Sequence, residues 1–384
     1  MSGRSHASIV LRWFLASRLA IYAIGVIGVA TFANLRWVAL EQSGEAPLND
    51  HPGAVINNTT ALNPGSVWQK WDAVAYERIA REGYAHEAGD IKGQEKAGYF
   101  PLYPLTVGAV LRVAPSLSIF WTASVLSNLF TVAALLLIVT HLVSGTELAE
   151  RVMAIMMTSA GSFYLSIPYT ESLFLLLVVA TLVATRRRHY ELAGLLAGLS
   201  ATTRVHGLAL IAVPVVACWL DATLPQAARL RRVAIAAVMF ALPLLAYFAY
   251  LARVQGSWLA FLSRQEMWQN PSPYPFQAIV GLFQFPTRIG SWVHGATWAV
   301  YVWLLVRYRR RLPLGEVLFC AGALLISTQQ AGFQGIYRYV VPLVPLTLAL
   351  AEDRHDVRHR MIAFNLVLGV LMILAFVTWN RLAV

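Results

Sequence analysis

Apolar runs of about twenty residues, each long enough to cross the ~30 Å hydrocarbon core of a bilayer as a helix, recur along this 384-residue chain. Of all residues, 58% are hydrophobic and only 13% are charged. In lipid, the backbone groups of a spanning segment must find partners within the protein, which restricts the fold to helices or a closed barrel. The alternating pattern of barrel strands is absent. The sequence therefore predicts an all-α polytopic membrane protein that forms one domain over residues 1–384.

The net charge of +11 comes from basic residues in short segments between apolar runs. Four clusters stand out: Arg186 to His189, Arg229 to Arg232, Arg307 to Arg311, and Arg354 to Arg360. This distribution is typical of loops that stay in the cytoplasm, and it does not form a surface that reads nucleic acid. We therefore expect a multi-pass protein of the cell membrane, surrounded by membrane lipids, with no nucleic-acid partner.

With all four clusters placed in the cytoplasm, the sequence predicts about eleven crossings, an internal N-terminus and an external C-terminus. The segment 101–116 is short and holds three prolines, so we expect it to dip into the membrane and return, which requires protein to cover its backbone. The expected helices span 8–33, 117–143, 150–167, 170–185, 191–204, 206–220, 233–252, 291–306, 312–331, 337–351 and 360–380.

Two larger loops then lie on the extracytoplasmic side. Within the first, 34–98, the stretch from about 67 to 81 predicts an amphipathic helix along the bilayer surface, with Glu77 and Arg81 paired on its polar face. The second, 253–290, is rich in aromatic residues and proline; it could cover an acceptor or serve as an ordinary capping loop. The apolar stripe of the expected helix consists of Trp68, Trp71, Ala75 and Ile79.

Asp72 is the acidic residue in this expected helix that most resembles a catalytic group. It follows Trp71 and precedes Tyr76 by one turn, so aromatic rings that can stack on a sugar flank it. A carboxylate in such a place can act as a general base that deprotonates a hydroxyl nucleophile. The alternative is a hydrated side chain, or one paired with Lys70.

Several charged residues lie within or beside apolar runs, at the ends expected to face outward. A carboxylate at membrane depth is unfavourable, so Glu171 should face a cavity or a partner. Arg338, between two tyrosines, and Arg204 can each direct two N–H donors to a phosphate, or they can reach lipid headgroups. His206 could donate to the same phosphate or be a packing histidine.

Motifs of other enzyme classes are absent. The chain has no Walker loop, no Rossmann glycine pattern, no His-Glu-x-x-His and no Gly-x-Ser-x-Gly. Cys218 and Cys320 lie within apolar runs, where a small buried hydrophobic residue is the simplest interpretation. We expect no disulfide, no metal-ligand cluster and no cofactor.

The motifs together resemble the PIG-V-like mannosyltransferases, which are membrane glycosyltransferases of the GT-C fold. The resemblance rests on Trp71-Asp72 with Tyr76, Gly83-Tyr84, Tyr99-Phe100-Pro101-Leu102-Tyr103-Pro104, Pro168-Tyr169-Thr170-Glu171-Ser172, Ala201-Thr202-Thr203-Arg204 and Tyr337-Arg338-Tyr339. It spans most of the chain. One departure follows Arg204, where Val-His-Gly stands in place of the Ser-Asn-Gly of eukaryotic members. The composition is typical of a bacterial member.

The resemblance implies a GT-C-like bundle that transfers mannose, with inversion, from a polyprenyl-phosphate-linked donor to a lipid or glycan acceptor on the extracytoplasmic face, without a metal. Asp72 would be the base, and Arg338, Arg204 and His206 would bind the donor phosphate. Glu171 would contact sugar hydroxyls. The full set of expected substrate contacts is Trp71, Tyr76, Tyr99, Tyr103, Tyr169, Glu171, Tyr337 and Tyr339.

A transporter or flippase for polyprenyl lipids or sugar lipids is the main alternative. Such a protein would use the same arginines to bind a lipid phosphate, but it would have no need of a carboxylate on an external helix. A structural scaffold is harder to reconcile with several ionisable residues at membrane depth.

Overall fold

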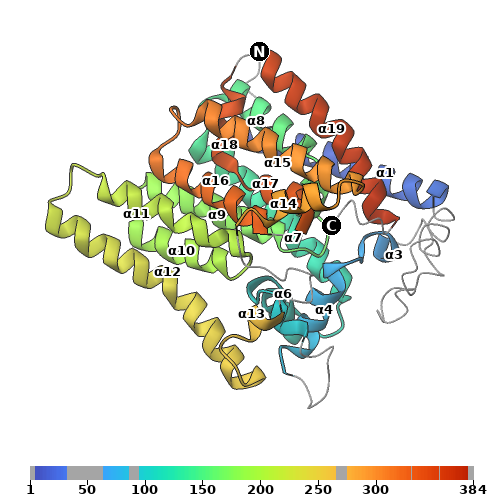
Figure 1. Ribbon diagram of the computed structural model, residues 1–384, viewed down its shortest axis with the longest axis horizontal. Helices are drawn as coiled ribbons and strands as arrows, with labels where there is room; N and C mark the ends of the chain where they lie inside the picture. Colours follow the sequence, from blue (N-terminus) through green and yellow to red (C-terminus); the bar gives the residue numbers. More distant parts are fainter. Residues whose placement is uncertain are drawn as a thin grey trace.

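The computed structural model describes residues 5–32, 64–85, 95–264, 275–329, 331–353 and 355–378, and every regular element in these ranges is a helix (Figure 1). The early part of the first loop, up to residue 63, and the middle of the second loop, 265–274, lie outside the described residues. The predictions made for those two stretches therefore concern parts of the chain that the structure does not describe.

Five described helices are long and apolar enough to cross a membrane. Their extents agree with expected apolar runs, and the prediction of a helical membrane protein is confirmed at this level. The predicted total of about eleven crossings is not confirmed, because the other apolar helices are shorter. The long helices are α1 (His6–Phe32), α7 (Ile119–Leu137) with its π-helical extension η3 (Ile138–Leu142), α12 (Gln226–Gln255), α15 (Ile289–Tyr308) and α19 (His355–Val377).

Several expected spans are interrupted in the structure. The segment 337–351 breaks after α17 because Pro342 has no N–H to continue the helix and blocks the preceding turn. The segment 191–220 divides where Arg204 takes an extended conformation, as predicted.

The shorter elements are α8 (Thr146–Thr158), η4 (Ser162–Leu165), α9 (Glu171–Arg186), α10 (Tyr190–Ala201), η5 (Val205–Ile211), α11 (Ala212–Trp219), α13 (Ala260–Arg264), α14 (Gln277–Gln284), α16 (Leu314–Ile326), η7 (Ser327–Gln329), η8 (Ala331–Phe333), α17 (Ile336–Val340) and α18 (Val344–Ala351).

The prediction of one continuous surface helix over 67–81 is wrong. The chain forms α3 (Pro64–Trp68), breaks, and starts again as α4 (Asp72–Glu82). The break leaves Trp71 at a φ of 57°, a conformation unfavourable for a bulky residue. Trp68 is fully buried because aromatic side chains from distant parts of the chain hold it: its ring stacks on Phe376 of α19 at 6.1 Å and meets Tyr22 of α1 edge-on at 5.5 Å.

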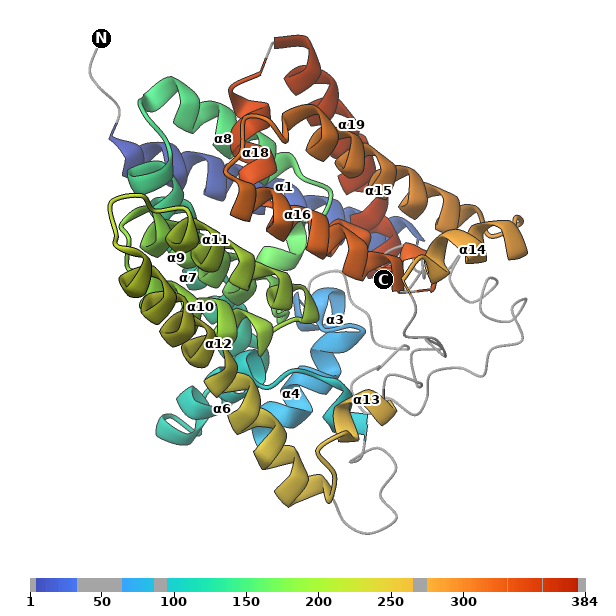
Figure 2. The same cartoon turned by 60° about the vertical axis from the view of Figure 1, so that its left-hand side comes forward.

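Helix α4 packs against α6 (Leu102–Val113), and the two backbones approach closely at Gly108. A Cβ atom at Gly108 would lie 2.5 Å from the carbonyl oxygen of Ala80. Helix α6 has 12 residues and is about 18 Å long, too short to cross the bilayer. The 3-10 turn η2 (Lys96–Gly98) joins the two helices to the C-terminal half of α12, which passes beside α4 and α6 in Figure 2. There the hydroxyl of Tyr247 donates to the carbonyl of Tyr99 at 3.0 Å.

The described residues of the four basic clusters lie at one end of the bundle. Arg232 of the second cluster donates to the carbonyl of Arg188 in the first at 3.4 Å. Arg186 pairs with Glu316 of α16 at 3.6 Å, and Arg307 pairs with Asp353, just before the fourth cluster, at 3.0 Å. Helix α9 leaves this end at Arg186 and reaches Glu171 about 24 Å away. Glu171 therefore lies at the opposite end from the basic clusters, while the side of the membrane that each end faces stays a prediction.

Candidate active site

Two acidic and two basic side chains from four separate elements meet at the end of the bundle opposite the basic clusters. Nη1 of Arg338 lies 2.8 Å from Oδ2 of Asp72, and Nε of the same arginine donates to Oε1 of Glu171. That oxygen of Glu171 also accepts a hydrogen bond from Nη1 of Arg204 at 2.6 Å. The structure thus brings together four residues that the sequence singled out from distant motifs. We call Asp72, Glu171, Arg204 and Arg338 the charge cluster.

The local backbone explains how each member is presented. Asp72 is the first residue of α4 and Glu171 the first residue of α9, so both carboxylates lie at helix N-termini, where the helix dipole favours negative charge. Arg338 lies on the short helix α17, which begins after Gly335 in the left-handed conformation. Arg204 follows α10 in an extended conformation, and its Nη1 donates to the hydroxyl of Thr170 at 2.9 Å as well as to Glu171.

Exposure differs across the charge cluster. The side chain of Glu171 is 1% exposed, that of Arg338 5% and that of Arg204 9%, whereas Asp72 retains 13%. Buried charges are tolerated when each has a partner, and two carboxylates here balance two guanidinium groups. Asp72 is therefore the member most accessible to an incoming hydroxyl group.

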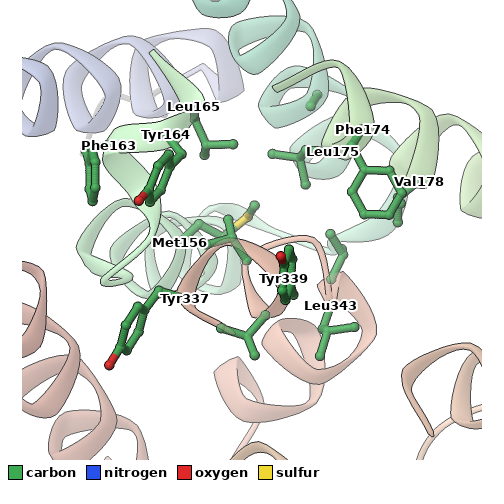
Figure 3. Close-up of a cluster of buried hydrophobic side chains, with 14 of the residues drawn as sticks. Met156, Phe163, Tyr164, Leu165, Phe174, Leu175, Val178, Tyr337, Tyr339 and Leu343 are labelled. Carbon is green, nitrogen blue, oxygen red and sulfur yellow. The ribbon is translucent and has the colours of Figure 1, made fainter. Parts of the chain in front are cut away.

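Aromatic rings cover both arginines. The guanidinium carbon of Arg338 lies 4.8 Å from the ring centre of Tyr169 and 5.1 Å from that of Tyr164, and the carbon of Arg204 lies 4.7 Å from that of Tyr339. Such contacts stabilise a cation that has left water. Figure 3 shows Tyr164 and Tyr339 on different segments of one buried cluster. The sequence did not single out Tyr164, because it lies in an apolar run without a charged neighbour.

His206 is held firmly within the protein. Its ring stacks on Tyr339 at 4.2 Å, and its Nε2 lies 3.1 Å from Oγ of Ser327, with donor and acceptor roles set by the tautomer. These contacts favour the packing interpretation. Within the described part of the chain, however, Nδ1 of His206 and Nε of Arg204 are buried without a hydrogen-bond partner. These two nitrogens therefore have hydrogen-bonding capacity that no described residue uses.

The tyrosines near Asp72 form a wall rather than a row of free hydroxyl groups. The ring of Tyr76 meets those of Tyr99, Tyr103 and Tyr169 edge-on, with centroids 5.4, 5.8 and 6.1 Å away. The hydroxyl of Tyr103 lies 2.9 Å from Oγ of Ser127. Burial, reinforced by the charge of Asp72, raises the pKa of Tyr76, so its phenol stays protonated.

Tyr169 and Tyr337, two of the expected substrate contacts, also have partners within the protein. The hydroxyl of Tyr169 donates to the carbonyl of Lys70 at 3.0 Å, which holds the segment leading to Asp72. Tyr337 packs edge-on against His294 of α15 at 5.1 Å, on another side of α17 from Tyr339 (Figure 3). Its ring therefore belongs to the packing between helices. Trp71, by contrast, stays half-buried beside Asp72.

Glu77 is a buried acid that sequence reasoning placed on an exposed face. It is 7% exposed, accepts a hydrogen bond from the side-chain amide of Gln69, and leaves Oε1 without a partner in the described residues. Burial raises the pKa of Glu77 to about 7, although the amide and the charge of Arg81 act in the opposite direction. The bond to Gln69 crosses the break between α3 and α4. Lys70, 1% exposed, lies in the same break.

Within the described ranges, no three side chains of His, Cys, Asp or Glu gather as a set of metal ligands. No protein-family model, curated protein or solved structure matches the chain. The class of protein must therefore be inferred from the fold and from the charge cluster. Together they define a helical membrane protein with a buried cluster of two acids and two arginines.

Proposed function

We propose that the chain is an inverting membrane glycosyltransferase of the GT-C type, which moves a hexose, mannose by its resemblance, from a polyprenyl-phosphate-linked donor to a hydroxyl group of a lipid or glycan acceptor. One observation carries this proposal. A partly exposed carboxylate, Asp72, pairs with the buried Arg338, and Glu171 joins Arg338 to the buried Arg204, at the end of the bundle away from the basic clusters. The transfer requires a base and a cationic site for the departing phosphate.

In the proposed reaction, the acceptor oxygen attacks the anomeric carbon of the donor sugar from the face opposite the phosphate. The new carbon–oxygen bond forms as the bond from the anomeric carbon to the phosphate oxygen breaks, and its electron pair leaves with the lipid phosphate. The acceptor proton passes to a carboxylate oxygen of Asp72. Guanidinium N–H groups stabilise the charge that develops on the phosphate.

The contacts of the charge cluster also constrain how a donor would bind. Nε and Nη1 of Arg338 are already committed to Glu171 and Asp72. Nε of Arg204 and Nδ1 of His206 have no partner among the described residues. The donor phosphate is therefore expected to meet Arg204 and His206 first and to share Arg338 with Asp72. The sequence expectation named the same three residues without an order.

The position of Glu171 argues against the sugar contact expected from the resemblance. Oε1 of Glu171 is shared between Arg204 and Arg338, and the side chain is 1% exposed. We assign Glu171 the role of holding the two guanidinium groups at a fixed separation. This assignment keeps Asp72 as the acid that faces the acceptor.

Transfer of label would test the proposal directly. Purified protein in lipid nanodiscs is incubated with radiolabelled polyprenyl-phosphate-mannose and a bacterial lipid extract, and the extract is separated by chromatography. A glycosyltransferase yields a labelled acceptor of higher mass. A transporter leaves the mass of every lipid unchanged in nanodiscs and, when the same protein is reconstituted in sealed vesicles, moves the labelled donor across the bilayer. That pair of results would overturn the proposal.

A further inference from the structure

Arg18 lies near the middle of α1, a helix long and apolar enough to cross a membrane, and its side chain is 5% exposed. Arginine at such a depth is unfavourable, so it is retained where it has a partner or a task. In the described part of the chain no carboxylate pairs with it. Its partners are neutral groups: Nη1 donates to the carbonyl of Ser162 at 2.8 Å and to Oγ of Ser166 at 2.7 Å.

Both partners belong to the stretch between α8 and α9, where the helix is interrupted. Non-helical backbone at membrane depth must have its free carbonyls satisfied by other parts of the protein. Here side chains from two neighbouring helices do so. Arg18 of α1 binds the carbonyl of Ser162, Thr131 of α7 donates to that of Leu165 at 2.7 Å, and Asn128 of α7 donates to that of Ser166 at 3.2 Å.

Ser166 joins the two helices. Its hydroxyl accepts from Arg18 and donates to Oδ1 of Asn128 at 2.7 Å, and its side chain is fully buried. The two helices therefore hold this stretch from two directions at one residue. A hydrogen-bonded chain of this kind fixes geometry more firmly than separate bonds do.

The stretch between α8 and α9 also supplies side chains that surround the charge cluster. Tyr164 and Tyr169 lie against the guanidinium group of Arg338, and Glu171 binds it. The hydroxyl of Tyr169 also holds the carbonyl of Lys70, two residues before Asp72. A shift of this stretch would therefore move Arg338 and Asp72 relative to each other.

We propose that Arg18 is a positioning residue: with Asn128, and through Ser166, it holds the stretch 159–170 so that Asp72 and Arg338 stay aligned. The consequence for catalysis rests on the proposed transferase function, whereas the consequence for the backbone does not. Arg18 touches no substrate in this proposal.

The test uses Ser166→Ala, which removes the shared hydroxyl and keeps both neighbours, together with Arg18→Gln. Hydrogen exchange is followed by mass spectrometry on the full-length protein in nanodiscs. We expect amides of 159–170 to exchange at least tenfold faster in both variants, while α10 and α12 stay unchanged. Arg12→Gln, an exposed arginine of the same helix paired with Glu150, is the matched control and should leave the stretch unchanged.

Kinetics then separate positioning from mere structural support. In both variants we expect kcat of sugar transfer to fall about tenfold or more and KM for the donor to change less than about twofold, because misplacement of reacting groups by about 1 Å can lower rates a hundredfold. Unchanged exchange in 159–170, or faster exchange with unaltered kcat, would overturn the proposal. If the wild-type protein transfers no sugar while exchange responds as expected, the proposed function fails and the bracing by Arg18 stands. If Arg18→Gln does not fold, Ser166→Ala decides.

Discussion

Arg338 and Asp72 are separated by 266 positions in the chain, yet Nη1 of the arginine lies 2.8 Å from Oδ2 of the aspartate. The same guanidinium group binds Glu171 through Nε. One side chain from α17 thus joins the N-termini of α4 and α9.

Asp72→Asn should abolish nearly all sugar transfer, with a loss of about a hundredfold to ten-thousandfold, which is the usual contribution of a general base. The amide can still accept a hydrogen bond from Arg338 through its oxygen, so the fold should persist. Initial rates and thermal unfolding of the purified variant check both statements. Asp356→Asn, an exposed aspartate of α19, is the control. Transfer by Asp72→Asn within a few fold of wild type would remove Asp72 from the mechanism.

Arg338→Lys should raise KM for the donor and lower kcat, because a lysine ammonium is a compact charge that cannot present two fixed donors to Asp72 and Glu171 at once. Donor titration measures the effect. Arg253→Lys, at an exposed position near the end of α12, should behave as wild type. Unchanged donor kinetics in Arg338→Lys would show that the guanidinium geometry has no part in the reaction.

Glu171→Gln should lower the free energy of unfolding by about 3 kcal/mol, the lower part of the range for breaking a buried ion pair. The loss follows because two buried guanidinium groups would face only one carboxylate. Denaturation in mild detergent measures it, with Glu352→Gln at an exposed site as control. A variant that keeps its stability and shows only weaker donor binding would restore the sugar-contact role that the resemblance implies.

Gly108→Ala should destabilise the packing of α6 against α4 by about 1 to 3 kcal/mol, as overpacking commonly does. The new Cβ atom would lie 2.5 Å from the carbonyl oxygen of Ala80, and backbone cannot move aside as a flexible side chain can. Gly281→Ala in α14 is the matched control, since nothing lies within 4 Å of its Cβ position. Equal thermal stability of the two variants would contradict the close approach of α4 and α6.

Glu77 should make stability depend on pH. Its pKa is about 7 in the folded protein against an ordinary 4.5, so the folded state holds the proton more tightly than the unfolded chain does. The contribution to stability is therefore complete below about pH 4.5 and is lost as the pH rises through about 7. Between pH 4.5 and 8, the thermal unfolding temperature should fall less steeply in Glu77→Gln than in wild type. Glu147→Gln, at an 80% exposed side chain, should leave the slope unchanged, and parallel curves for all three proteins would contradict the prediction.

The long helices could be predicted because their signal is local. The expected ranges 8–33 and 291–306 differ by two residues or fewer at each end from His6–Phe32 and Ile289–Tyr308. The break before α4 could not be predicted. No glycine or proline marks it, and it depends on Trp68, which is held by α1 and α19 from distant parts of the sequence.

The candidate site was predictable in its members but not in their pairing. That Glu171 and Arg338 need partners follows from the unfavourable burial of a charge. That they partner each other, across 167 positions, depends on how α9 and α17 meet. Tyr103 and Tyr169 were expected to contact the substrate. Their hydroxyls bond within the protein, to Ser127 and to the carbonyl of Lys70, and those partners appear only once the helices are packed.

The position of Asp72 inside the charge cluster has a consequence for turnover. A sugar phosphodiester brings one negative charge, and the released lipid monophosphate carries two when fully ionised. In the proposed transfer, the proton taken up by Asp72 removes one negative charge from the protein as the phosphate gains one. The total charge enclosed by these helices would then be the same before and after the chemical step, so no ion would have to enter a region that water barely reaches.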